Sequence, residues 1–235
     1  MAVVLKLTCL ALVAMGSVQS AELPVGKCSL SDKACLIPAA QKMVPVFTAG
    51  MPQFGVEVLD PAKNFGIEYD LSGLQFSLTD GTLSGLKSVV INDIDFDTTK
   101  KVLVIAFTGD LSVEGHYTAG GKVLVHPISG DGRMKLDMKN MYIKILIDFE
   151  TVNGHVKPTK YTSEFELKDS AHFDLTNLFN GDKELSEHMI KFLNENYKQI
   201  FGAFGKPLVD TAAEHIYKNI AIFFEKLPIA DIANI

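Results

Sequence analysis

The chain has 235 residues, with 22 lysine and arginine residues against 28 aspartate and glutamate residues and a formal net charge of −6. This acidic balance, with the basic residues scattered along the chain, argues against a nucleic-acid partner and against constitutive docking on anionic lipid. The length fits one large domain or two small ones.

The first 20 residues have the pattern of a secretory signal peptide. Lys6 is followed by an apolar run from Leu7 to Met15 and by small residues before Ala21. The run is shorter than the roughly 20 residues of a membrane-spanning helix, and no later stretch is long and charge-free enough. We therefore predict cleavage after Ser20 and a secreted, extracellular protein without stable membrane insertion.

Removal of the signal peptide takes Cys9 away and leaves Cys28 and Cys35 as the cysteines of the mature chain. In an oxidising compartment we expect them to form a disulfide. A metal site at the two thiolates is the weaker alternative, because no second Cys or His pair lies at a zinc spacing nearby.

The next segments predict one helix and a connector. Asp32 to Phe47 carries apolar residues at intervals of three or four, which indicates an amphipathic helix. Residues 50–61 contain two prolines and two glycines, so they favour turns over a long helix.

From Phe65 to about Glu166 the pattern alternates between apolar and polar residues, as in the run from Met141 to Phe149. This predicts an antiparallel meander. We place hairpin turns at Asp80-Gly81, Gly120-Gly121, Gly130-Asp131-Gly132 and Asn153-Gly154. The segment Val102–Phe107 is apolar throughout, which predicts a strand covered on both faces.

Helix signals begin at Asp182, a plausible N-cap, and continue to Leu227, where Pro228 ends them. Pro207 either starts a second helix or kinks one long helix, and the sequence leaves both open. Because no linker separates the strand-rich and helix-rich parts, they should share one core. The expected fold class is α+β, with a long C-terminal helix against or inside a curved antiparallel sheet.

Motifs for chemistry are missing from the sequence. There is no Gly-x-Ser-x-Gly pentapeptide, and the six histidines are widely spread. Asp93, Asp95 and Asp97 resemble the start of a calcium loop, but Thr98 and Val104 stand where that loop needs glycine and a bidentate acid. We therefore expect no catalytic residue, no metal and no cofactor.

Three stretches carry a resemblance to a known family: Leu178–Leu185, Phe192–Tyr197 and Ile222–Pro228. With the cysteine pair and residues 50–61, they resemble the takeout / juvenile-hormone-binding family of insect proteins over essentially the whole mature chain. Carriers of juvenile hormone usually have a second disulfide, which this chain cannot form after Cys35, so the takeout branch fits better. Tyr197 stands where many relatives place tryptophan.

The resemblance implies a non-enzymatic carrier with a single ligand-binding domain at residues 21–235. Its long helix would be wrapped by a strongly curved antiparallel sheet that encloses an apolar tunnel. The implied ligand is a juvenile-hormone-like terpenoid, a fatty acid or another lipid-like molecule. A membrane-touching lipid-transfer protein and a hormone-ester hydrolase remain as alternatives.

Residues of the helical stripe are the candidates for the tunnel wall, with ordinary core packing as the alternative role. They are Phe201, Phe204, Ile216, Ile220 and Phe223, with Tyr142 as a possible phenolic hydrogen-bond partner. We expect a monomer, because a stripe that bound another protein would leave a large exposed apolar patch.

Overall fold

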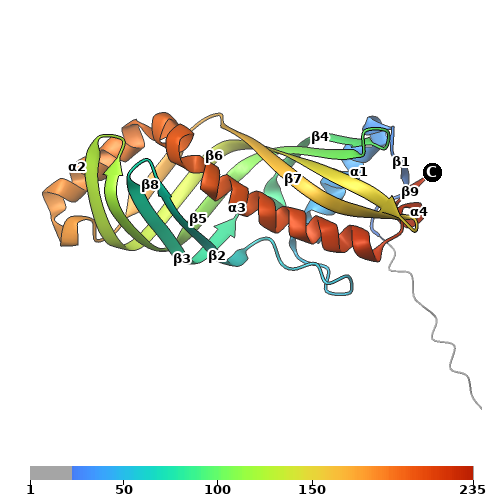
Figure 1. Cartoon of the computed structure of the whole chain (residues 1–235), viewed down its shortest axis with the longest axis horizontal. Helices are drawn as coiled ribbons and strands as arrows, with labels where there is room; N and C mark the ends of the chain where they lie inside the picture. Colours follow the sequence, from blue (N-terminus) through green and yellow to red (C-terminus); the bar gives the residue numbers. More distant parts are fainter. Residues whose placement is uncertain (1–22, 235) are drawn as a thin grey trace, which may run out of the picture.

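The computed structural model describes residues 23–234, so the predicted signal peptide lies outside the described residues. One large antiparallel sheet and a 30-residue helix, α3 (Tyr197–Lys226), make up most of it (Figure 1). The strands of the sheet are β2 (Ala62–Leu71), β3 (Leu74–Ser84), β4 (Val90–Asp97), β5 (Val102–Val123), β6 (His126–Val152), β7 (His155–Leu167) and β8 (Ala171–Leu175). The α+β prediction is confirmed.

The sheet is held together by its two longest strands. Strand β5 pairs with β4 over its first residues and with β3 over its last residues, and β6 pairs in the same way with β7 and β8. The β5–β6 pairing shifts register between Gly109 and Leu111, a bulge that bends both strands. Both ends of the sheet therefore belong to one continuous, curved structure that is not closed into a barrel.

The glycine signals gave one hairpin turn correctly and three wrongly. Asn153-Gly154 joins β6 to β7, but Asp80-Gly81 lies inside β3, Gly120-Gly121 inside β5, and Gly130-Asp131-Gly132 inside β6. A Cβ atom at Gly81 would collide with the carbonyl oxygen of Phe65, and one at Gly130 with the hydroxyl of Tyr117. These glycines allow close approach within long bent strands, which explains the error.

Helix α1 (Lys33–Thr48) begins and ends one residue later than predicted, with Asp32 as its N-cap. The Cys35 backbone N–H donates to the Asp32 carboxylate at 3.2 Å. The predicted disulfide between Cys28 and Cys35 is present and ties the start of this helix to β1 (Cys28–Ser29). Strand β1 pairs in parallel with β9 (Ala233–Asn234) at the other end of the chain.

The C-terminal helical region is divided, but not at the proline. Helix α2 (Lys183–Glu195) ends before Asn196, and α3 then runs through Pro207 to Lys226. The predicted N-cap is confirmed, since the Leu185 N–H donates to the Asp182 carboxylate at 3.0 Å. After Pro228 a single turn, α4 (Ile229–Ile232), leads into β9. Within the described residues, no helix is both long and apolar enough to cross a bilayer.

Helix α3 lies across the open side of the sheet (Figure 1). It packs on both edge strands: Tyr217 stacks on Tyr161 of β7 with ring centroids 4.7 Å apart, and His215 lies 5.9 Å from Phe65 of β2. One cluster of buried side chains unites α1, the sheet and α3. The strand-rich and helix-rich parts thus share a core, as the sequence predicted, and the space along α3 becomes the site to examine.

Candidate ligand-binding site

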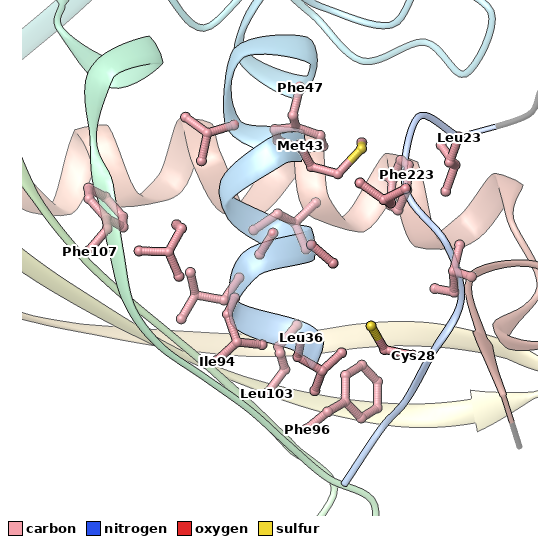
Figure 2. A pocket seen from close by; sticks show the side chains of 18 of the residues that line it. Leu23, Cys28, Leu36, Met43, Phe47, Ile94, Phe96, Leu103, Phe107 and Phe223 are labelled. Carbon is pink, nitrogen blue, oxygen red and sulfur yellow. The ribbon is translucent and has the colours of Figure 1, made fainter. Parts of the chain in front are cut away.

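A cavity of about 280 Å³, here called cavity 1, lies at the end of the molecule that carries α1, β1 and β9. Figure 2 shows side chains from four parts of the chain pointing into it. Its principal lining residues include Leu36, Met43 and Phe47 of α1, Ile94 of β4, Phe107 of β5 and Phe223 of α3. Such a volume is close to the lower limit of ordinary small-molecule pockets.

The walls of cavity 1 follow from the local sequence patterns. In β5, the alternating residues Leu103, Ile105 and Phe107 all face the cavity, because successive strand side chains point to opposite faces. In α1, lining residues recur every three or four positions, and two of them, Ala39 and Ala40, are small. These alanines leave room that larger side chains would fill.

The lining of cavity 1 is almost free of polar groups. Among the described residues that line it, none is charged and none titrates, and Thr48 is the one with a hydroxyl. That hydroxyl donates to the carbonyl oxygen of Val44 at 2.8 Å, so its hydrogen is already used. A ligand here would be selected by apolar area and shape, because a charged group would lose its hydration without gaining a partner.

Both ends of the chain close cavity 1 on one side. Leu23, Val25 and Leu30 line it from the N-terminal segment, and Ile232 and Ala233 line it from the C-terminal segment. The β1–β9 pairing joins these segments, and the Asn234 side-chain amide donates to the Lys27 carbonyl oxygen at 3.2 Å. No periodic pattern marks such short terminal segments, so sequence reasoning missed this wall.

A second, smaller cavity of about 100 Å³, here called cavity 2, lies near α2 at the opposite end of the molecule. It is lined from α3 by Ile200, Phe201, Phe204 and Leu208, and no described residue lines both cavities. The inward-facing residues between the two sets are tightly packed, each at most 4 % exposed: Phe65, Leu111, Val113, Val209 and Ala213. The apolar interior along α3 therefore consists of two compartments.

The predicted wall residues divide between these compartments. Ile216, Ile220 and Phe223 line cavity 1, whereas Phe201 and Phe204 line cavity 2. Helical spacing identified the face of α3 correctly but gave no information about the gap between the cavities.

Tyr142 lines neither cavity. Its neighbours Met141 and Ile143 are each 1 % exposed and face the interior, so strand alternation places Tyr142 on the other side of β6. There the ammonium group of Lys168 lies 4.8 Å from the ring centroid. This phenol packs beneath a surface lysine and takes no part in the walls described above.

Comparisons with known proteins agree with this geometry. The family model for haemolymph juvenile hormone binding protein (JHBP) matches residues 7–234. The crystal structure of Epiphyas postvittana Takeout 1 superimposes with a TM-score of 0.87 at 49% identity, covering 90% of this chain and all of that chain. The circadian clock-controlled protein daywake of Drosophila melanogaster is 30% identical over 195 residues, which are 75% of this chain and 74% of daywake.

A further relative is the juvenile hormone-binding protein of Manduca sexta. It is 33% identical over 89 residues, which make up 37% of this chain and 39% of that protein. The match to Takeout 1 therefore covers much more of the chain than the match to this hormone-binding protein.

Proposed function

The chain belongs to the haemolymph juvenile hormone binding protein family, and we propose from this that it is a secreted carrier that holds a small hydrophobic molecule in cavity 1. The observation that carries the proposal is the lining of this cavity, which has no charged side chain among the described residues and a single hydroxyl that is already bonded. Ile216, Ile220 and Phe223 are the proposed contacts from α3.

The apolar lining also narrows the class of ligand. A carboxylate inside cavity 1 would lose its hydration without finding a cation or a free donor. A fatty acid would have to keep its charged end in water, whereas a neutral terpenoid, ester or hydrocarbon could be enclosed completely. We therefore favour a neutral ligand.

The expected affinity follows from buried area. A ligand that buries about 500 Å² of apolar surface gains roughly 12 kcal/mol on transfer from water. Association costs of about 4–15 kcal/mol must be subtracted, which leaves affinities on the order of micromolar to nanomolar. Such a range suits a carrier, because the ligand must also be released.

We further propose that residues 21–235 form one domain that is exported after removal of residues 1–20. The composition of the first 20 residues supports this proposal. The disulfide between Cys28 and Cys35 also supports it, since such bonds persist in oxidising compartments.

Native mass spectrometry of the secreted protein, followed by extraction and identification of the bound molecule, tests the carrier role. We expect one neutral lipid-like molecule per chain, or uptake of one equivalent of methyl farnesoate by protein that was purified empty. The ester should be recovered intact from the complex. Failure to take up methyl farnesoate, farnesol or a long hydrocarbon would contradict the proposal, and hydrolysis of the ester would favour an enzyme.

A further inference from the structure

Cavity 2 differs from cavity 1 in one polar group. Tyr69 of β2 and Lys135 of β6 are its two lining residues with polar side chains. Met134 and Leu136, on either side of Lys135, are 8 % and 4 % exposed, so alternation turns Lys135 outward, where its ammonium pairs with Asp137 at 3.0 Å. By the same rule, Tyr69 shares the inward face of β2 with Ile67, which is 8 % exposed.

The ring of Tyr69 is fixed in place by its neighbours. It stacks on Phe76, its cross-strand partner in β3, with centroids 5.4 Å apart and planes inclined by 27°. Phe76 in turn stacks on Tyr117 at 6.5 Å. The Tyr69 hydroxyl is therefore held at a defined position, which lowers the entropic cost of using it as a ligand contact.

The two phenols of this stack differ in their hydrogen bonds. The Tyr117 hydroxyl donates to the carbonyl oxygen of Thr176 at 2.8 Å, whereas the Tyr69 hydroxyl has no hydrogen-bond partner among residues 23–234. Since no fully enclosed polar atom of these residues lacks a partner, the Tyr69 hydroxyl adjoins open space. Burial raises the pKa of Tyr69 to about 12, so the group stays protonated and able to donate at physiological pH.

Water is a poor occupant of this space. A buried water molecule needs about two to four polar partners, and cavity 2 offers one hydroxyl within otherwise apolar walls. An apolar molecule with one acceptor oxygen matches the lining better, because its oxygen accepts the Tyr69 proton while its carbon atoms meet the surrounding leucine and phenylalanine side chains.

We propose that cavity 2 is a second binding site, for a compact neutral molecule with a single carbonyl, ester or ether oxygen that accepts a hydrogen bond from Tyr69. The size, about 100 Å³, suits a molecule near that of one substituted aromatic ring. This site goes beyond the carrier role of cavity 1, and its occupancy does not require that cavity 1 be filled.

Acetophenone and isopropylbenzene are matched probes for this site, because they have nearly the same shape and only acetophenone has a carbonyl oxygen. The δ1-methyl NMR signals of Ile67, Ile128 and Ile200 report on cavity 2, and those of Ile94, Ile105 and Ile220 report on cavity 1. Titrating both probes into wild type and Tyr69→Phe gives separate dissociation constants for each cavity.

We expect acetophenone to shift the cavity 2 signals and Tyr69→Phe to weaken its binding there by about 3- to 10-fold, since one net hydrogen bond is lost. The same substitution should leave isopropylbenzene unchanged. Ala119→Leu, which fills cavity 2 from β5, should weaken both probes at the cavity 2 signals and neither at the cavity 1 signals.

Equal acetophenone affinity in wild type and Tyr69→Phe, or no response of the cavity 2 signals, would overturn the proposal. Neither result would touch the carrier role, which is tested by methyl farnesoate at the cavity 1 signals. Loss of response at cavity 1 alone would contradict the carrier role and leave the second site in place.

Discussion

Cys28 and Ala233, which are separated by almost the whole described chain, are direct partners in the parallel pairing of β1 with β9. Both residues line cavity 1, and Cys28 is also bonded to Cys35 of α1. The pairing of two residues per strand is too short to be stable alone. The closing wall of the cavity therefore depends on the disulfide that holds one of its two segments.

Replacing both Cys28 and Cys35 with alanine should loosen this wall more than it weakens the rest of the fold. The disulfide closes a short loop, so we expect a loss of about 2–3 kcal/mol in the free energy of unfolding. Ligand should leave cavity 1 faster, because the N-terminal segment loses its covalent attachment. Thermal denaturation and stopped-flow release of a fluorescent ligand measure the two effects, with Ser31→Ala as the control. An unchanged release rate would show that the wall does not limit escape.

Filling cavity 1 from α1 should abolish binding without unfolding the protein. Ala40→Phe places a ring in the cavity, and we expect a loss of affinity of at least about 10-fold with a change of less than about 1 kcal/mol in stability, because the space exists already. Ala203→Phe, on the exposed side of α3, is the matched control and should bind normally. Calorimetry with methyl farnesoate measures both variants, and equal affinities would exclude cavity 1 as the site.

Much of the fold could be predicted because its signals are local. The N-caps Asp32 and Asp182, the alternation along β6 and the apolar stripe of α3 depend on residues close in sequence. The break at Asn196 was missed because Pro207, a stronger sequence signal, is accommodated inside α3. Gly81 and Gly130 were misread as turns because their role depends on contacts with Phe65 and Tyr117.

The candidate site could be predicted only in part. Ile216, Ile220 and Phe223 were found from helical spacing, but the walls supplied by α1, β4, β5 and the chain ends require tertiary contacts. The different surroundings of Tyr142 and Tyr69 depend on which face of the sheet each occupies. That choice is fixed by the register and curvature of strands distant in sequence, which residue types alone do not specify.

Asn219 should be important for holding residues 50–61 against α3. It is 2 % exposed, accepts the Glu57 backbone N–H at 2.7 Å and donates to the His215 carbonyl oxygen at 2.9 Å. Asn219→Leu removes the acceptor and leaves that N–H unpaired, at an expected cost of about 1–3 kcal/mol. Urea denaturation measures the loss, and hydrogen exchange should accelerate at Glu57. Lys218→Ala, next along α3 and exposed, should change neither.

The binding of a neutral ligand in cavity 1 should be independent of pH, because no described lining residue titrates. We expect the same affinity for methyl farnesoate from about pH 5 to about pH 8, where histidines change charge. Calorimetry across this range measures it. A tenfold change in affinity would indicate a titratable contact and would contradict the apolar description of the site.

Stability, in contrast, should fall in acid through groups such as Asp110. Its hydrogen bond to the Lys139 ammonium at 2.8 Å holds the pKa of this carboxyl below its ordinary value of 3.8. The carboxylate therefore stabilises the fold above pH 3.8, and this contribution disappears as the pH falls through the lowered pKa. Asp110→Asn should be slightly less stable than wild type near neutral pH and lose less stability on acidification. Both side chains are largely exposed, so the effect is small and should shrink further in high salt. Urea denaturation of both proteins at a series of pH values measures the difference, and parallel pH profiles would show that the ion pair contributes nothing.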